Sequence, residues 1–184
     1  MTDIDAILKE LRKQGGDNAE YEVKECTNEL SKDVWESVSA FADTDGGVIL
    51  LGISEKDGFV PVENFRIDEV CDQFVAGMGD GGTKGKLTNP PEYHIERPIY
   101  KEKAVLEIHI SELDLAQKPC YITNRGLQGG SYKRIDDKDI KLSLNEIVDV
   151  SSVTAKWAGF SRRRQWVRFA VDDKRDEGEW LKRA

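Results

Sequence analysis

The sequence has 184 residues, 39% of them hydrophobic, which suffices for one globular domain with a core rather than two. Its net charge of -8 argues against binding nucleic acid through overall electrostatics alone. The longest apolar run, residues 48–53, is too short to span a bilayer, and the N-terminus has no signal-like segment, so we expect a cytoplasmic protein without membrane contact. Its 3 cysteines form no Cys-x-x-Cys pair and support neither a disulfide framework nor a zinc site.

The charge is unevenly distributed along the chain. Residues 151–184 contain nine Lys or Arg and five Asp or Glu, a net charge of +4, so residues 1–150 carry -12. In this last segment Arg162, Arg163 and Arg164 lie among aromatic residues. Such a segment can bind phosphates and stack on bases, or pack its rings on the domain and leave its arginines in solvent. We therefore predict a domain over residues 1–150 and a basic, aromatic tail over residues 151–184.

Helix and strand patterns alternate in the first third of the chain. Apolar residues at helical spacing predict a helix over residues 4–14. Residues 20–24 alternate as a short strand. A second helix is predicted from Ser31, as its N-cap, to the glycine pair at residues 46–47. The apolar run at residues 48–53 is typical of a strand covered on both faces, so we expect it at the centre of a sheet.

Strands predominate in the rest of the domain. A turn at residues 57–58 leads to a returning strand from Phe59, and a helix is predicted over residues 66–76. The later elements are two strands over residues 92–100 and 104–110, a second pair over residues 119–123 and 130–135, and a helix that a Ser-x-x-Glu capping box opens at residue 143.

The glycine-rich loop at residues 77–91 contains a formal G-x-G-x-x-G match. A dinucleotide site needs this pattern between a strand and a helix, whereas here it follows a helix and leads to prolines, so we reject that interpretation. Lys84 and Lys86 of the loop could contact an anionic ligand, or could simply keep the loop in solvent.

Several carboxylates could meet beside the first strand. Asp17 and Glu22 would lie near Glu55, in the turn after the apolar strand, if the two strands are neighbours. Clustered carboxylates are what a metal-dependent nuclease uses to hold Mg or Mn. The alternative is a solvated acidic face, because 35 acidic residues place several close together by chance. Lys24, on the same strand face, either pairs with these acids or contacts phosphate.

Lys133 and Arg134 form the best basic pair of the domain, beside a tyrosine that could stack on a base. The alternative is a solvated hairpin edge, where lysine prevents strand pairing. The 2 histidines, His94 and His109, are too few for an imidazole-based metal cluster. We interpret His109, which lies in a strand pattern, as structural.

Several motifs occur in a recognisable order. An acid at residue 17 precedes Glu-Val-Lys, the second helix ends in Ala-Phe-Ala-Asp-Thr-Asp-Gly-Gly at residues 40–47, and Lys-Pro-Cys-Tyr-Ile and Gly-Ser-Tyr-Lys-Arg-Ile follow later. Together they resemble the Schlafen-like AlbA domain family over about residues 16–147. Val23 and Asp43 stand where the family usually has Phe and Asn. The Asp-Thr-Asp-Gly-Gly junction lies at a helix C-terminus, which does not favour phosphate, so we expect it to position the site rather than form it.

The resemblance implies an α+β fold, a mixed β-sheet flanked by helices, and a nucleic-acid-directed role. In relatives with two copies of the module it implies cleavage of structured RNA at three carboxylates. Asp17 and Glu22 match the first two positions, whereas Ser54 stands where the third acid is common and leaves Glu55 as the nearest candidate. A single module could rebuild the cleft between two copies as a homodimer.

Three functions stay open at this point. The leading hypothesis is a nucleic-acid-binding module of the DNA-binding, transcriptional-regulator type, which contacts the phosphate backbone through Lys24, Lys133, Arg134 and the tail. The second is a metal-dependent endoribonuclease that acts on structured RNA with Mg or Mn held by its three carboxylates. The third is a protein interaction module, which agrees best with the acidic domain.

Overall fold

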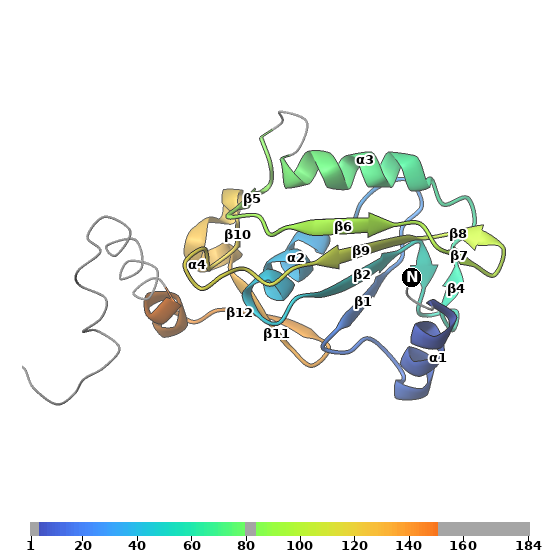
Figure 1. Ribbon diagram of the computed structural model, residues 1–184, viewed down its shortest axis with the longest axis horizontal. Helices are drawn as coiled ribbons and strands as arrows, with labels where there is room; N and C mark the ends of the chain where they lie inside the picture. Colours follow the sequence, from blue (N-terminus) through green and yellow to red (C-terminus); the bar gives the residue numbers. More distant parts are fainter. Residues whose placement is uncertain (1–3, 80–83, 151–184) are drawn as a thin grey trace, which may run out of the picture.

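The computed structural model describes residues 4–79 and 84–150 and places a mixed four-stranded sheet at the centre of the domain (Figure 1). Its strands, in spatial order, are β1 (Tyr21–Lys24), β2 (Gly47–Leu51), β9 (Leu106–Ile110) and β6 (Tyr93–Glu96). β1 runs parallel to β2, whereas β9 pairs antiparallel with both β2 and β6. The expected α+β fold, a mixed sheet flanked by helices, is confirmed.

Helices cover both faces of this sheet. They are α1 (Ile4–Gln14), α2 (Val34–Asp43) and α3 (Ile67–Met78). Ile49 and Leu51 of β2 lie in the core that α2 and α3 form, whereas Leu50 between them packs with α1. β2 is therefore buried on both sides, as its uninterrupted apolar sequence predicts. None of the helices in the described ranges is both long and apolar enough to cross a membrane.

Short strand pairs surround the sheet. They are β3 (Ile53–Ser54) with β4 (Val60–Pro61), β7 (Ile99–Tyr100) with β8 (Lys103–Ala104), β5 (Leu87–Thr88) with β10 (Tyr121–Ile122), and β11 (Tyr132–Ile135) with β12 (Lys138–Lys141). The 3-10 helix η2 (Thr123–Arg125) and the short helix α4 (Gly126–Gly130) lie between β10 and β11. The predicted pairing of residues 119–123 with 130–135 is wrong except for one bridge, Tyr121 to Ser131, because β5 and β12 are the partners instead.

The two predicted helix starts differ in outcome. Asp33, not Ser31, occupies the cap position of α2, so the assignment of Ser31 as the N-cap is wrong; the Ser31 hydroxyl bonds the Asp33 carboxylate instead. The capping box is confirmed, because Ser143 N donates to Glu146 Oε2 at 2.8 Å and Glu146 N donates to Ser143 Oγ at 3.4 Å. A helix follows over residues 144–150.

Two glycines allow the tight crossing from α2 to β2. Gly46 has a φ of +75°, and a Cβ there would lie 2.8 Å from the carbonyl oxygen of Ile110. A Cβ on Gly47 would overlap the ring of Phe41. Glycine alone fits both positions, so the end of α2 is held directly against β2 and β9.

Candidate functional site

The predicted carboxylates meet at the start of β1. Asp17 lies between α1 and β1, where its Oδ1 accepts a hydrogen bond from Val23 N at 3.0 Å. Glu22 of β1 is only 8% exposed, so the alternative interpretation of a solvated acidic face is wrong for this residue. A Cβ on Gly16 would lie 3.1 Å from Glu55 Oε1, which shows that the turn after β3 reaches the same place.

These carboxylates influence one another without forming one ion site. Burial, followed by the negative charge of Glu22, raises the pKa of Asp17 to about 7, and the charge of Glu55 acts in the same direction. Three carboxylates have the oxygen donors that Mg or Mn prefers. In the described parts of the chain, however, the three side chains whose ligand atoms lie close enough to share one metal ion, within 4.8 Å of one another, are Glu96, Glu107 and His109. As folded, the three β1-side carboxylates do not fit a shared ion.

Arg134 holds Glu22 in place. Its guanidinium lies 2.7 Å from Glu22 Oε2 and 2.8 Å from Asp139 Oδ1, and it donates to the carbonyl oxygen of Asn18 at 2.8 Å. The Arg134 side chain is 2% exposed and packs over the Phe41 ring. A buried guanidinium with two carboxylate partners is not available to a phosphate backbone. The prediction of Arg134 as a nucleic-acid contact is therefore revised to a buried structural ion pair.

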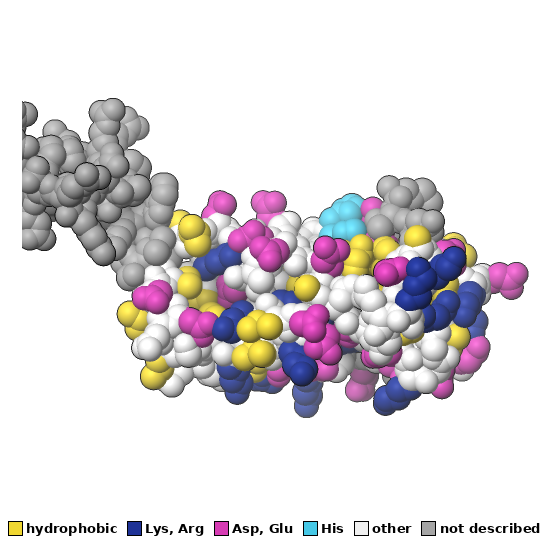
Figure 2. Space-filling view, turned by 90° about the horizontal axis from the view of Figure 1, so that it is seen from below, with side chains coloured by type: hydrophobic (Ala, Val, Ile, Leu, Met, Phe, Trp, Pro, Cys, Tyr) yellow, Lys and Arg dark blue, Asp and Glu magenta, His cyan; other side chains and the backbone are white. Residues whose placement is uncertain are grey.

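Two further predicted cations are also paired. Lys24 Nζ lies 2.7 Å from Glu22 and 3.0 Å from Asp33, and its side chain is 11% exposed. Lys133 pairs with Glu146 of the capping box. Their charges are compensated within the domain, and acidic and basic side chains intermingle over much of the face in Figure 2. Arg162, Arg163 and Arg164 lie outside the described residues.

The remaining predicted cations, Lys84 and Lys86, line a surface depression of about 650 Å³ together with Lys32 and Arg125. We call this depression, defined by these four cations, the basic groove. Its cations come from the loop before α2, the loop before β5 and η2. Lys86 Nζ lies 5.4 Å from the ring centroid of Trp35. The carbonyl oxygen of Lys86 accepts a hydrogen bond from the residue that begins η2, at 2.9 Å, which fixes two of these segments to each other.

The charge balance of the basic groove differs from that of the β1 site. Within residues 4–79 and 84–150, Lys32, Lys84 and Lys86 form no ion pair, whereas Arg125 pairs with Glu36 at 2.6 Å. Sequence reasoning missed Lys32 and Arg125 because each is an isolated cation, far along the chain from the glycine-rich loop. No local signal could have found them, since only folding brings the three segments together.

The Asp-Thr-Asp-Gly-Gly junction has a structural role. Asp43 Oδ1 accepts a hydrogen bond from Cys120 N at 2.8 Å, and Thr44 Oγ1 accepts one from Arg134 N at 2.9 Å. Lys118 Nζ donates to the carbonyl oxygen of Asp43 at 3.0 Å. The end of α2 thus anchors Cys120, the residue before β10, and Arg134 within β11, and these contacts position the two strands.

Comparison with known proteins agrees with this fold. A family model described as Schlafen, AlbA_2 matches residues 17–143, so the chain belongs to the Schlafen, AlbA_2 family. The N-terminal domain of a protein from Nitrosomonas europaea, described as related to the ATP-dependent DNA helicase RecG, is 29% identical with a TM-score of 0.50, over 78% of this chain and 95% of that one. The DIP2311 protein from Corynebacterium diphtheriae is 15% identical with a TM-score of 0.47, over 74% of this chain and 24% of that one. No curated protein matches the chain.

Proposed function

We propose that the chain binds nucleic acid and that the basic groove contacts the phosphate backbone. The observation that carries the proposal is the convergence of four cations on one depression, three of them without an acidic partner in the described residues. Clustered cations recognise backbone phosphates, and counterion release makes the affinity fall as salt rises. Family membership supports a nucleic-acid role, and the Nitrosomonas domain belongs to a protein described as related to a DNA helicase.

The groove offers contacts to the backbone rather than to bases. Thr123 and Asn124 also line it and can add neutral hydrogen bonds to phosphate or sugar oxygens. Its aromatic residue, Trp35, is 3% exposed, so the ring is not presented for stacking on a base. We therefore expect binding with little base preference, in keeping with a regulatory DNA-binding module that recognises nucleic-acid shape.

Replacing Lys32, Lys84 and Lys86 together with glutamine tests this proposal. Fluorescence anisotropy at low salt should show affinity for a labelled DNA duplex or RNA hairpin reduced roughly 10- to 100-fold, because about three phosphate contacts are lost. For the duplex, the slope of log affinity against log salt should become shallower by about 2 to 3.

The matched control replaces Lys9, Lys101 and Lys138 with glutamine. These lysines are exposed, lie elsewhere on the surface, and give the same change in net charge. The control variant should bind as the wild type does. Equal weakening in both variants would contradict a groove-specific contact, and wild-type protein that binds neither nucleic acid would favour a protein interaction module instead.

A metal-dependent ribonuclease is the second candidate. Asp17, Glu22 and Glu55 lie close enough for their charges to interact, which supports it, although their ligand atoms are not within reach of one shared ion as folded. Lys24 and Arg134 neutralise Glu22, so binding of Mg or Mn there would require these ion pairs to rearrange. Mn- or Mg-dependent cleavage of a tRNA-like hairpin that Glu22→Ala abolishes would establish this activity, and cleavage retained by Glu22→Ala would exclude the role of Glu22.

A homodimer stays a prediction, which sedimentation velocity can check.

A further inference from the structure

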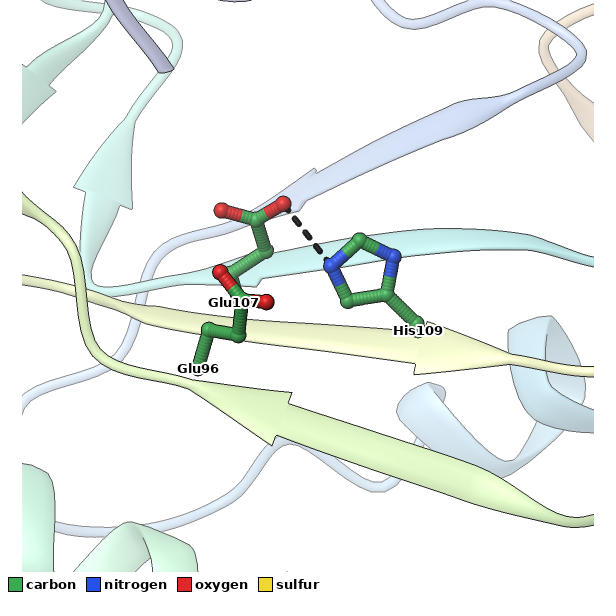
Figure 3. Close-up of side chains that lie close together, drawn as sticks. All are labelled: Glu96, Glu107 and His109. Atoms are coloured by element: carbon green, nitrogen blue, oxygen red, sulfur yellow. Dashed lines mark ion pairs between the residues drawn. The ribbon is translucent and has the colours of Figure 1, made fainter. Parts of the chain in front are cut away.

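Four side chains with metal-binding chemistry share one face of the β6–β9 pair. Glu96 lies directly opposite Glu107, and His94 directly opposite His109, in the antiparallel register. Opposed residues of an antiparallel pair point to the same face, and so do alternate residues of one strand. The histidine side chains form one surface patch, cyan in Figure 2. Figure 3 shows Glu96, Glu107 and His109 turned toward one another across the two strands.

Glu107 is the buried member of this cluster. Its side chain is 0% exposed, and neither carboxylate oxygen has a hydrogen-bond partner among the described residues. His109 Nε2 lies 2.9 Å from Glu107 Oε1, close enough for an ion pair (dashed in Figure 3), yet this nitrogen makes no hydrogen bond within the same residues. A buried carboxylate without donors is strongly unfavourable unless a cation compensates for its charge. The fold therefore holds two ligand atoms side by side without their expected partners.

Glu96 completes a set of three ligand atoms. One atom from each of Glu96, Glu107 and His109 lies within 4.8 Å of the other two. The side chains of Glu96 and His109 are 35% and 33% exposed, so an ion can enter from solvent while Glu107 holds it from inside. Two ligands of one ion lie about 3 Å apart when each bond is about 2.0–2.1 Å long. The separation of Glu107 Oε1 and His109 Nε2 agrees with that spacing.

We propose that Glu96, Glu107 and His109 bind a divalent transition-metal ion, for which Zn²⁺ is the suitable probe. One imidazole and two carboxylates suit Zn²⁺ or Mn²⁺, whereas Mg²⁺ and Ca²⁺ favour oxygen donors throughout. The ion supplies the missing partner of Glu107 and ties the edge strand β6 to β9. His94, whose Nε2 lies 3.5 Å from Glu96 Oε1, is the nearest further donor.

This metal site revises the expectation drawn from the sequence, and it is independent of the proposed nucleic-acid function. Two histidines are too few for an imidazole-based cluster, but strand register adds two carboxylates to the set. β1, which carries Glu22, and β6, which carries Glu96, are opposite edges of the sheet. Metal binding can therefore be tested without any nucleic acid.

Isothermal titration calorimetry and thermal unfolding of the full chain near pH 7.5 test the site. Zn²⁺ should bind in a 1:1 ratio and, at about a hundredfold excess over its Kd, raise the unfolding midpoint by roughly 5–10 °C. The same concentration of Mg²⁺ should leave the midpoint unchanged. Glu107→Gln should remove the Zn²⁺-dependent shift. Because the substitution also removes a buried carboxylate charge that accepts no hydrogen bond within the described residues, the metal-free variant should unfold at the wild-type temperature or higher.

Two further variants control this experiment. Glu96→Gln changes a partly exposed ligand and should weaken Zn²⁺ binding roughly tenfold or more, with the far-UV circular dichroism spectrum unchanged. Glu29→Gln changes an exposed glutamate in the loop after β1 and should keep wild-type Zn²⁺ binding. No binding by the wild type, or undiminished Zn²⁺ binding by both Glu107→Gln and Glu96→Gln, would overturn the proposal.

Discussion

Asp43 carries a partly buried carboxylate at the end of α2, whose Oδ1 accepts the Cys120 amide while Oδ2 has no hydrogen-bond partner among the described residues. Burial raises its pKa from 3.8 to about 7, although the Cys120 hydrogen bond and the charge of Lys118 act in the opposite direction. The carboxyl group of Asp43 therefore binds its proton more tightly in the folded state than in the unfolded state. The resulting loss of stability is absent at a pH below the unfolded pKa, grows as the pH rises, and is complete above the folded pKa.

Asp43→Asn should accordingly stabilise the domain near pH 8. The amide keeps an oxygen for Cys120 N and removes the buried charge, so the free energy of unfolding should rise by about 1–3 kcal/mol near pH 8 and hardly change near pH 4. Urea unfolding at the two pH values measures this difference. Wild-type stability should itself fall as the pH rises through this interval, since the pKa of Asp17 is also raised. A variant less stable than the wild type near pH 8 would contradict the assignment.

Arg134→Ala tests the revised role of a residue first predicted to contact nucleic acid. The substitution removes the guanidinium that Glu22 and Asp139 share, and it leaves Glu22 with Lys24 as its single cationic partner among the described residues, so the free energy of unfolding should fall by about 3–5 kcal/mol. Combining Arg134→Met with Glu22→Gln should recover part of this loss, because two opposite charges are removed together while Asp139 still lacks its cation. Chemical denaturation of both proteins provides the values. An Arg134→Ala protein with wild-type stability but weakened nucleic-acid binding would restore the original interpretation.

At the level of elements, the local sequence pattern was sufficient to predict helices and strands whose buried faces follow from the spacing of apolar residues along the chain. The apolar spacing of α1, α2 and α3 and the unbroken apolar run of β2 predicted these elements and their buried faces. The errors arise where a partner comes from far along the chain. β10 pairs with β5, and Glu22 is buried because β11 brings Arg134 to it. Alternation within one strand cannot tell whether its polar face is covered.

The packing of α3 on α2 depends on a glycine. Trp35 stacks on Phe74 with ring centroids 5.5 Å apart, and a Cβ on Gly77 would overlap the Trp35 ring. Gly77→Ala should therefore lower the free energy of unfolding by about 1–3 kcal/mol, although alanine is the better helix former. Gly129→Ala in α4 is the control, because a Cβ there would lie 3.8 Å from the Cβ of Arg125, which is an ordinary van der Waals contact. Thermal unfolding that gave equal effects for both variants would contradict this packing.

Across the whole molecule, the carboxylate cluster beside β1 could be predicted from the sequence, whereas the basic groove and the metal site could not. Asp17 and Glu22 are identified from the spacing of one motif. The basic groove is assembled from three separate segments, and the metal site from the register of two strands. Neither arrangement follows from local propensity, because both depend on which distant segments pack together. Compensation of charge within the domain also explains why the predicted pair Lys133 and Arg134 is less suited to phosphate than the groove lysines.

The central claim is that nucleic acid binds at the basic groove. Amide chemical-shift changes in the ¹⁵N-labelled full chain, recorded during titration with a short DNA duplex and separately with an RNA hairpin, locate the contact directly. We predict the largest changes at Lys84, Lys86 and Arg125 and small changes along β1 and β6. Changes concentrated at Glu22 and Lys24, with the amides of the basic groove unaffected, would contradict the claim.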